Sequence, residues 1–177
     1  LNATPRGCYD ESKRFGGTLT VAYDREHDLD VRTAQIFNTY GPRMRPDDSR
    51  VIPAVISQAL DGRNLTIYGG GSQTRSFCYV VDLVRGLRAI MNYSGLQGEV
   101  INIGNDHKVI IRELAEFLLN VCETDSKLTY EPLPEDDPSR RCPDLSQARD
   151  LLDLEPEIGL QDGLQDGLQR TINSFEK

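Results

Sequence analysis

Tyr9 and Lys13 lie four residues apart in the segment Cys8-Tyr9-Asp10-Glu11-Ser12-Lys13-Arg14. If this segment is helical, the phenol and the ammonium share one face, one turn apart. A cation beside a phenol favours the phenolate and lowers a tyrosine's pKa, so the phenol oxygen can take a proton from a substrate hydroxyl near neutral pH. The same spacing also arises by chance on a solvated helix face. The pair is therefore a candidate acid/base device that needs support from its surroundings.

The surroundings of this pair are predicted from hydrophobic periodicity and turn residues. Helices are expected over residues 9–27, 50–60, 80–91, 109–121, 146–152 and about 162–175. Strands are expected over residues 31–37, 65–68, 98–103 and 127–130. The strand at 98–103 is expected to be buried, and the strand at 127–130 to lie at a sheet edge because prolines follow it. Strands that alternate with helices indicate an α/β fold.

Two glycine-rich segments need separate interpretation. Gly69-Gly70-Gly71 is followed by no helix-opening pattern, so it is interpreted as a turn rather than a phosphate-binding loop. Residues 159–168 repeat Gly-Leu-Gln-Asp with a period of four, which keeps the leucines near one helical face. A tandem duplication at the entrance of the last helix explains this better than a functional repeat. Gly163 and Gly167 are expected to weaken that helix by about 1 kcal/mol each relative to alanine.

Composition excludes several classes of protein. A net charge of −8 and a pI near 4.8 argue against a nucleic-acid-binding surface, which needs concentrated Lys and Arg. No stretch reaches the roughly 18 apolar residues of a membrane span, and no signal-peptide pattern occurs at the start. The four cysteines are scattered and only two histidines accompany them. We therefore expect no metal site, and we expect the cysteines to be free thiols.

Five ordered motifs extend the evidence from the Tyr9 segment to most of the chain. They are Cys8 to Arg14, Ile36-Phe37-Asn38-Thr39-Tyr40-Gly41-Pro42-Arg43-Met44, Ile67 to Phe77, Asn102-Ile103-Gly104-Asn105, and Asp136-Asp137-Pro138-Ser139-Arg140-Arg141-Cys142-Pro143-Asp144. In this order and spacing they resemble the C-terminal part of an extended short-chain dehydrogenase/reductase of the NAD-dependent epimerase/dehydratase family. Within that family the UDP-glucuronate decarboxylases, or UDP-xylose synthases, are most similar.

The resemblance implies the C-terminal part of a Rossmann-type enzyme with its smaller substrate-binding lobe. Residues 1–45 would end the dinucleotide-binding domain, and residues 46–177 would form mainly the substrate lobe, with possible return strands to the sheet. A full-length member begins with a strand, a Gly-x-x-Gly-x-x-Gly turn and a helix that receives the cofactor pyrophosphate. That half is not present in this sequence, so we expect a fragment that leaves apolar surface exposed and is marginal, self-associating or rearranged.

The resemblance also implies a reaction with NAD on a UDP-sugar. Tyr9, as phenolate beside Lys13, would deprotonate the sugar C4 hydroxyl while the C4 hydride passes to NAD. The 4-keto sugar is a β-keto acid, so carbon dioxide leaves from C5, and hydride return then gives UDP-xylose. A serine or threonine and a glutamate that the family supplies from upstream are missing, so the isolated chain is expected to be inactive.

The family assigns further cofactor and substrate residues. Asn38 follows a predicted strand, at the end where open α/β sheets bind ligands, and would hydrogen-bond the substrate near its diphosphate; without the family, an Asn in a turn is an equal interpretation. Thr39 and Arg45, together with Tyr9 and Lys13, would contact the nicotinamide half of NAD. Arg45 is the weaker candidate of the four because neighbouring arginines make a solvated loop charge an alternative.

Arg75, in Gln73-Thr74-Arg75-Ser76-Phe77, is the strongest substrate candidate after the tyrosine. An arginine fork can grip a phosphate or a carboxylate with two hydrogen bonds, which lysine cannot. In epimerases and dehydratases of the family the matching arginine serves the diphosphate, whereas in decarboxylases it is linked to the carboxylate step. The sequence leaves both roles open, so Arg75 is assigned to catalysis as well as to substrate binding.

Three more residues of the last two thirds of the chain receive expectations. The family implies that Arg141 contacts the nucleotide. Tyr68 would line the nucleoside pocket, or else belong to the core as an aromatic at a strand end. Arg140 is expected to pair at the surface with Asp136 or Asp137.

Alternatives and partners complete the expectations. A UDP-sugar 4-epimerase or a nucleotide-sugar 4,6-dehydratase shares the tyrosine helix and the Asn38 strand, and a truncated, non-catalytic binding or assembly module is the alternative from another class. A homodimer is expected, because in related enzymes the Tyr9 helix packs against its twin. No nucleic acid or membrane partner is expected for this segment. The resemblance implies a cytoplasmic location, although a membrane anchor upstream in the parent protein remains open.

Overall fold

The computed structural model describes residues 5–134, 137, 139–158 and 163–175. Its helices are α1 (Pro5–His27), α2 (Val51–Leu60), α3 (Val80–Asn92), α4 (Ile111–Val121), α5 (Ser146–Leu152) and α6 (Gly163–Phe175). Its strands are β1 (Thr33–Ile36), β2 (Thr39–Tyr40), β3 (Leu65–Tyr68), β4 (Thr74–Ser76), β5 (Cys78–Tyr79), β6 (Val100–Ile103), β7 (Lys108–Ile110), β8 (Leu128–Glu131) and β9 (Arg140–Arg141). The predicted α/β class is confirmed.

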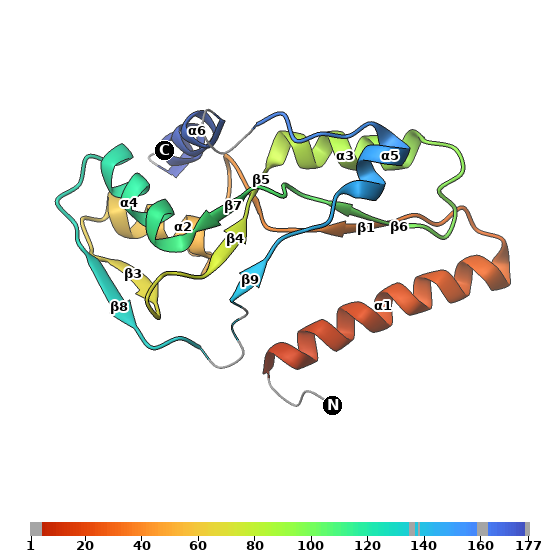
Figure 1. The fold of residues 1–177 in the computed structure, drawn as a ribbon, viewed down its shortest axis with the longest axis horizontal. Coiled ribbons are helices and arrows are strands. Elements are labelled where there is room, and N and C mark those ends of the chain that lie inside the picture. Colours follow the sequence, from red (N-terminus) through yellow and green to blue (C-terminus); the bar gives the residue numbers. More distant parts are fainter. Residues whose placement is uncertain (1–4, 135–136, 138, 159–162, 176–177) are drawn as a thin grey trace.

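One part of the body is built on the parallel pair β1 and β6, where Thr33 is opposite Val100 and Ile36 opposite Ile103. Helices α3 and α5 lie above this pair in Figure 1. A small hydrophobic cluster joins the four elements; its buried members are Ile90, Leu96, Ile101, Ile103 and Ala148. Strands 67 residues apart in sequence therefore share one small core.

The other part of the body holds most of the buried side chains. It contains the parallel pair β3 and β8, the three-stranded sheet β7-β4-β9 and helices α2, α4 and α6 (Figure 1). Its large hydrophobic cluster runs from Tyr40 and Ile52 through Leu65 and Leu118 to Ile172. The short parallel pair β2 and β5 carries the chain from the first part of the body into the second. This second part is the framework of the arginine site described below.

Local sequence explains most of these elements. In α2 the apolar side chains Ile52, Val55 and Ile56 are buried at helical spacing. The helix ends as predicted at Asp61, where Gly62 takes a positive φ of 66°. Gly69 and Gly71 also have positive φ, which confirms the turn expected between two strands.

Five short strands of the described chain were not predicted from the sequence: β2, β4, β5, β7 and β9. Each has two or three residues, too few for an alternating pattern to stand out. Strand β7 includes Val109 and Ile110, which were assigned to a helix; α4 begins only at Ile111. Strand β6 is not buried throughout as predicted, since Val100 is 40% exposed.

Helix α1 projects from the body, and no other helix or strand runs along it in Figure 1. It approaches the body near its end, where a Cβ added to Gly98 would lie 3.2 Å from Asp24 Oδ2. Its large apolar side chains Phe15, Leu19 and Tyr23 are each more than two-fifths exposed. The exposed apolar surface expected for this segment is therefore present. In the described part of the chain, no helix combines the length and hydropathy needed to cross a bilayer.

Helix α6 gives the glycine repeat a packing role. A Cβ added to Gly167 would lie 2.7 Å from Tyr40 Oη and 3.1 Å from Tyr79 Cδ2, so only glycine permits this approach. Leu168, the neighbouring repeat leucine, is fully buried. The expected helix-propensity cost of Gly167 is thus accompanied by close packing. Leu160, the first leucine of the repeat, lies outside the described residues, so the expectation that it shares a helical face with the other repeat leucines stays a prediction.

Candidate functional site

Tyr9 and Lys13 form the first candidate group, on α1. Lys13 Nζ lies 5.6 Å from the centroid of the Tyr9 ring, so the two side chains share one helical face as predicted. The Tyr9 side chain is 60% exposed. The Ser12 hydroxyl between them donates a hydrogen bond back to the Tyr9 carbonyl, at 2.7 Å. The pair is therefore assembled locally and open to a ligand from the solvent side.

Asn38 and Thr39 lie where the chain leaves β1. Asn38 Nδ2 donates to the Ser76 carbonyl at 3.3 Å, and the Cys78 N–H donates to the Asn38 carbonyl at 2.8 Å. The Thr39 hydroxyl donates to the Phe37 carbonyl at 3.0 Å. These bonds fix Asn38 beside the strand segment that carries Arg75, although the two residues are far apart in sequence.

Arg75 lies in the central strand of the sheet β7-β4-β9. Its Nη2 bonds Asp137 Oδ2 at 2.8 Å, and its Nη1 donates to the Thr74 carbonyl at 2.8 Å. The Arg75 side chain is 11% exposed and that of Asp137 is 18% exposed. Surface ion pairs contribute little, but a pair shielded to this degree holds its partners in defined positions.

Arg141 stands next to Arg75 on the neighbouring parallel strand. The register pairs Thr74 with Arg140 and Arg75 with Arg141, so Arg75 and Arg141 extend from the same face of the sheet. Adjacent strands are about 4.8 Å apart, so the two arginine side chains start from neighbouring positions on this face. Two neighbouring cations on one sheet face form an anion-binding arrangement.

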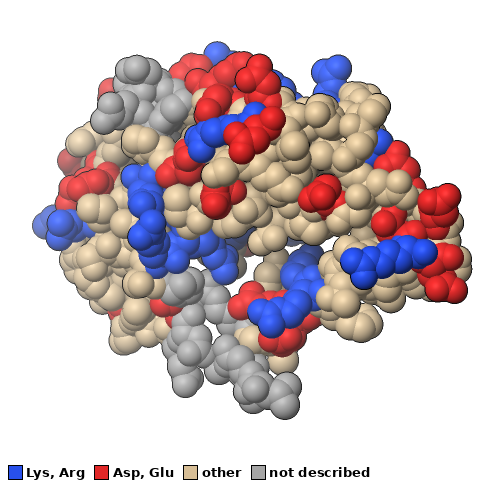
Figure 2. Space-filling model, turned by 45° about the vertical axis from the view of Figure 1, so that its right-hand side comes forward, with Lys and Arg blue, Asp and Glu red and all other residues tan. Residues whose placement is uncertain are grey.

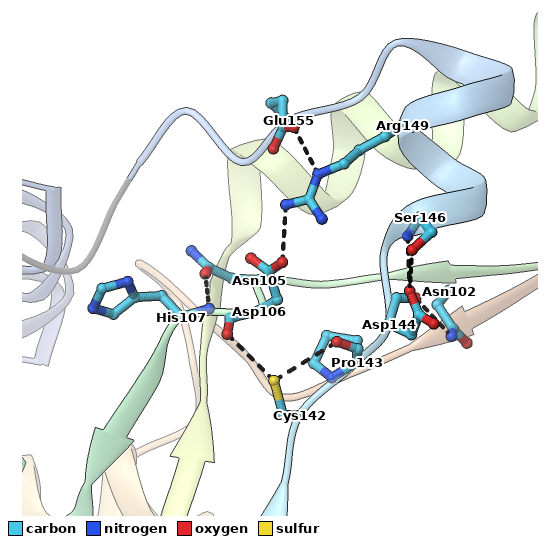
Figure 3. Close-up of polar contacts among 10 residues, drawn as sticks. All are labelled: Asn102, Asn105, Asp106, His107, Cys142, Pro143, Asp144, Ser146, Arg149 and Glu155. Atoms are coloured by element: carbon cyan, nitrogen blue, oxygen red, sulfur yellow. Dashed lines mark hydrogen bonds and ion pairs between the residues drawn. The ribbon is translucent and has the colours of Figure 1, made fainter.

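Contacts after β9 hold this strand in place (Figure 3). Cys142 Sγ donates to the Asp106 carbonyl at 3.3 Å, and Asn102 Nδ2 donates to the Asp144 carbonyl at 2.9 Å. The Ser146 hydroxyl and N–H both donate to Asp144 Oδ1, and these bonds hold the pKa of the Asp144 carboxyl below its usual value. The segment that follows Arg141 is thereby tied to the end of β6.

A second set of contacts fixes α5 to the same place. The Arg149 guanidinium bonds Asp106 Oδ2 at 2.9 Å and Glu155 Oε1 at 2.6 Å, and both carboxylates are visible beside it in Figure 3. These three residues come from the β6–β7 loop, from α5 and from the segment after it. Helix α5 and the segment after β9 are therefore both attached to the end of β6.

Tyr68 and Arg45 lie outside this group. Tyr68 ends β3 and is 48% exposed, so its assignment to the core is wrong and its possible role at a nucleoside stays a prediction. Arg45 pairs with Asp47 through two bonds of 2.9 and 2.6 Å, and the two side chains are 80% and 67% exposed. The structure does not bring Arg45 into contact with the other candidates.

Acidic and basic side chains are intermixed over the face drawn in Figure 2. In β5, Cys78 is 1% exposed, and burial raises the pKa of its thiol to about 12. Burial likewise raises the pKa of Tyr40. All four cysteines are free thiols, as predicted.

The residues present fit only one side of a bound NAD. Tyr9 and Lys13 are accessible, as contact with a nicotinamide ribose requires. The Gly69–Gly71 segment forms a turn between β3 and β4 with no helix behind it, so it offers no helix N-terminus to a pyrophosphate. Among the described residues, the Gly69–Gly71 turn therefore provides no pyrophosphate cradle, and contact of Tyr9 and Lys13 with the nicotinamide half stays a prediction.

Asp137 is the site residue that sequence reasoning assigned differently. It was expected to pair with Arg140 at the surface, but its carboxylate reaches Arg75, 62 positions away. The signal available in the sequence was an acidic residue four positions before Arg141. That signal could not identify Arg75 as the partner, because the contact depends on the pairing of β4 with β9.

Comparisons with known proteins identify the family. A family model described as NAD dependent epimerase/dehydratase family matches residues 1–104. UDP-glucuronic acid decarboxylase 6 of Arabidopsis thaliana is 46% identical over 158 residues, which cover 89% of this chain and 46% of the relative. UDP-glucuronic acid decarboxylase 1 of Danio rerio is 45% identical over 173 residues, which cover 98% of this chain and 40% of the relative.

Solved structures agree with these relatives. The UDP-glucuronic acid 4-epimerase of Bacillus cereus, in complex with UDP-glucuronic acid and NAD, has a TM-score of 0.82 at 30% identity, over 91% of this chain and 50% of that chain. The dTDP-glucose 4,6-dehydratase DesIV of Streptomyces venezuelae, with NAD bound, has a TM-score of 0.85 at 29% identity, over 95% and 50% of the two chains. The chain thus spans about half the length of the proteins it matches. It belongs to the NAD-dependent epimerase/dehydratase family of Rossmann-type short-chain dehydrogenases.

Proposed function

We propose that this chain forms the substrate side of an NAD-dependent enzyme that decarboxylates UDP-glucuronate to UDP-xylose. The observation that carries the proposal is the placement of Arg75 beside Arg141 on one sheet face, with Asn38 bonded to the adjacent Ser76. The 46% and 45% identity to proteins named UDP-glucuronic acid decarboxylase supports this substrate. Residues 1–45 would belong to the dinucleotide-binding domain and residues 46–177 mainly to the substrate lobe.

Each candidate residue has a role in this proposal. Tyr9, as phenolate, takes the proton of the sugar C4 hydroxyl, and Lys13 stabilises that phenolate and holds the nicotinamide ribose. NAD, when bound, supplies reversible hydride acceptance. Arg75 and Arg141 bind oxyanions of the nucleotide sugar, and Asn38 donates near the diphosphate. Thr39 and Arg45 contact the nicotinamide half, and Tyr68 lines the nucleoside pocket.

The chemistry of decarboxylation follows from the ketone at C4. Once C4 is a carbonyl, the carboxylate at C5 is β to it, so the electrons of the breaking C–C bond are accepted as an enolate. Arg75 would bind the departing carboxylate or the diphosphate. Tyr9 is exposed, so it does not by itself shield the carboxylate or the diphosphate from water. The chain alone is therefore proposed to be inactive, and the complete enzyme is proposed to be a homodimer that contacts its copy through α1.

Two other functions have observations in their favour. The likeness to a UDP-glucuronic acid 4-epimerase and a 4,6-dehydratase favours a related reaction on a nucleotide sugar. The projecting α1 and the lack of a pyrophosphate cradle in the described residues favour a truncated, non-catalytic binding or assembly module. The four free thiols support a reducing compartment, and we place the protein in the cytoplasm on that basis.

A rebuilt enzyme tests the proposal. This chain would be joined to the part of the Danio rerio UDP-glucuronic acid decarboxylase 1 that it does not match, and supplied with NAD and UDP-glucuronate. We expect release of carbon dioxide and formation of UDP-xylose, and a loss of about 100-fold or more in kcat for Tyr9→Phe, as for removal of a catalytic acid/base group.

The products separate the alternatives. An epimerised UDP-sugar without carbon dioxide would replace the decarboxylase proposal by the epimerase. A folded, UDP-binding hybrid without any turnover would favour the non-catalytic module.

A further inference from the structure

Among the arginine–aspartate pairs of the described residues, that of Arg75 and Asp137 has both side chains less than one-fifth exposed. Arg45 and Arg50 each grip the neighbouring aspartate through Nε and Nη2. Arg75 contacts Asp137 through Nη2 alone, and its Nη1 is bonded to the Thr74 carbonyl. A guanidinium has five N–H donors, so this contact leaves part of the fork available.

Among the described residues, this ion pair has a second arginine as its neighbour. Arg141 stands beside Arg75 in register, so two arginine side chains leave the same sheet face, and Arg75 is paired with the Asp137 carboxylate. A single carboxylate carries one negative charge, whereas a nucleoside diphosphate offers several oxygens and more charge to both cations. Because the side chains of Arg75 and Asp137 are only 11% and 18% exposed, solvent screens this competition weakly.

The location of Asp137 allows its carboxylate to leave. Asp137 lies in the connection between β8 and β9, where its N–H donates to the Pro134 carbonyl at 3.2 Å, and it belongs to no strand of the sheet. Arg75, by contrast, is held by strand pairing on both sides, with Val109 on one and Arg141 on the other. The carboxylate can therefore be displaced without breaking the sheet.

We propose that Asp137 is the resident counter-ion of Arg75, and that an oxyanion of the nucleotide sugar binds by displacing the Asp137 carboxylate. This inference rests on the proposed function, since it specifies how the same arginine site receives its substrate. Asp137 would set the affinity of the site by occupying Arg75 whenever the oxyanion is absent. It is thus a residue that tunes substrate binding without reacting.

Calorimetric titration of the 177-residue chain with UDP tests the displacement. Asp137→Asn keeps the size and a hydrogen-bond acceptor but removes the competing charge. We expect the Kd for UDP to fall about five- to tenfold, because one charge-assisted contact no longer has to be broken. A merely structural role would predict weaker binding, so the direction of the change decides. Unchanged or weaker binding of UDP and UDP-glucuronate by Asp137→Asn would overturn the proposal, as would failure of every variant to bind either.

Matched variants confine the effect to this pair. Asp61→Asn removes a carboxylate that also lies 2.8 Å from an arginine Nη2, but with both side chains about 60% exposed, and it should leave the Kd unchanged. Arg75→Ala is expected to abolish UDP binding, and Asp137→Asn in that background should not restore it, because the arginine for which the carboxylate and the oxyanion compete is absent. A gain in that background would contradict displacement at Arg75.

Two ligands distinguish which oxyanion is received. A gain with UDP identifies the diphosphate, whereas a gain with UDP-glucuronate alone identifies the sugar carboxylate. The outcome is also separate from that of the rebuilt enzyme. Decarboxylation by the rebuilt enzyme together with weaker UDP binding by Asp137→Asn would contradict only the displacement of Asp137. Tighter UDP binding by Asp137→Asn without decarboxylation would contradict only the proposed reaction.

Discussion

Helix α1 and the sheet β7-β4-β9 both carry proposed site residues, but they are built in opposite ways. On α1, Tyr9 and Lys13 are neighbours because of helical spacing alone, and the apolar side chains of the helix are exposed. In the sheet, Arg75 and Arg141 are neighbours because strands far apart in sequence pair next to the large hydrophobic cluster. The acid/base pair is thus set by local geometry and the anion site by tertiary structure.

This difference has a functional meaning. A region that is stabilised by its own hydrophobic core, such as the sheet β7-β4-β9, can bind a ligand by itself. An exposed helix such as α1 needs a second surface to position it. The projecting α1 and the open face around it therefore indicate where the rest of a family member, or a second copy, would pack. The arginines proposed to bind an anion, by contrast, both lie within this chain.

The largest expected effect is the difference in unfolding free energy between alanine substitutions of two helical leucines. Leu118 of α4 is fully buried in the large cluster, and Leu19 of α1 is 44% exposed. Leu118→Ala should lower the free energy of unfolding by about 3 kcal/mol, since it leaves a cavity, and Leu19→Ala should change it by less than about 0.5 kcal/mol. Urea unfolding followed by circular dichroism measures both. Equal losses would mean that α1 is packed as tightly as the body.

A pair of helical glycines should give effects of opposite sign. Gly167→Ala forces a methyl group against Tyr40 and Tyr79 and should destabilise by about 1–2 kcal/mol. Gly16→Ala in α1 meets nothing within 4 Å, so it should raise the helicity and stabilise α1 by about 0.5–1 kcal/mol. Thermal unfolding and far-ultraviolet circular dichroism test the two signs. Stabilisation by Gly167→Ala would show that α6 is not seated on these tyrosines.

The smallest effect concerns alkaline pH. Burial raises the pKa of the Cys78 thiol to about 12, above its value in the unfolded chain. The folded state therefore keeps a proton that the unfolded state loses, so stability is complete below about pH 9 and falls as the pH rises above it. At pH 10 the loss should be about 1 kcal/mol, measured by urea unfolding under reducing conditions. Cys78→Ala should weaken this dependence of stability on pH. An equally steep loss of stability in that variant would mean that other titrating groups cause the dependence.

Local patterns predicted the helices and the longer strands well. The apolar spacing of residues 51–60 and the helix-ending Asp61-Gly62 correctly predicted α2. The proximity of Tyr9 and Lys13 was predictable because it requires only that their segment is helical. Strands such as β9 were beyond reach, because two residues show no periodicity and their pairing partner lies more than 60 positions away. The exposure of Val100 was missed because a parallel strand is buried throughout only when both of its faces are covered.

The arginine site was predictable in its members but not in its contacts. Arg75 and Arg141 were identified through the family resemblance, and their adjacency appears only once β4 and β9 are paired. The contact between Arg75 and Asp137 likewise follows from tertiary structure. Residue type and motif therefore indicate which groups take part, and long-range pairing decides which of them meet.

Titration of the unmodified 177-residue chain with UDP and, separately, with NAD tests the central contrast most directly. On the proposed function, the described residues hold the anion-binding arginines but not the pyrophosphate turn of the dinucleotide site, so UDP should bind with a Kd of about 0.1–1 mM and NAD should give no measurable heat. Arg75→Ala should abolish the UDP signal, and Tyr9→Phe should leave it unchanged. Tight binding of NAD together with no binding of UDP would contradict the account.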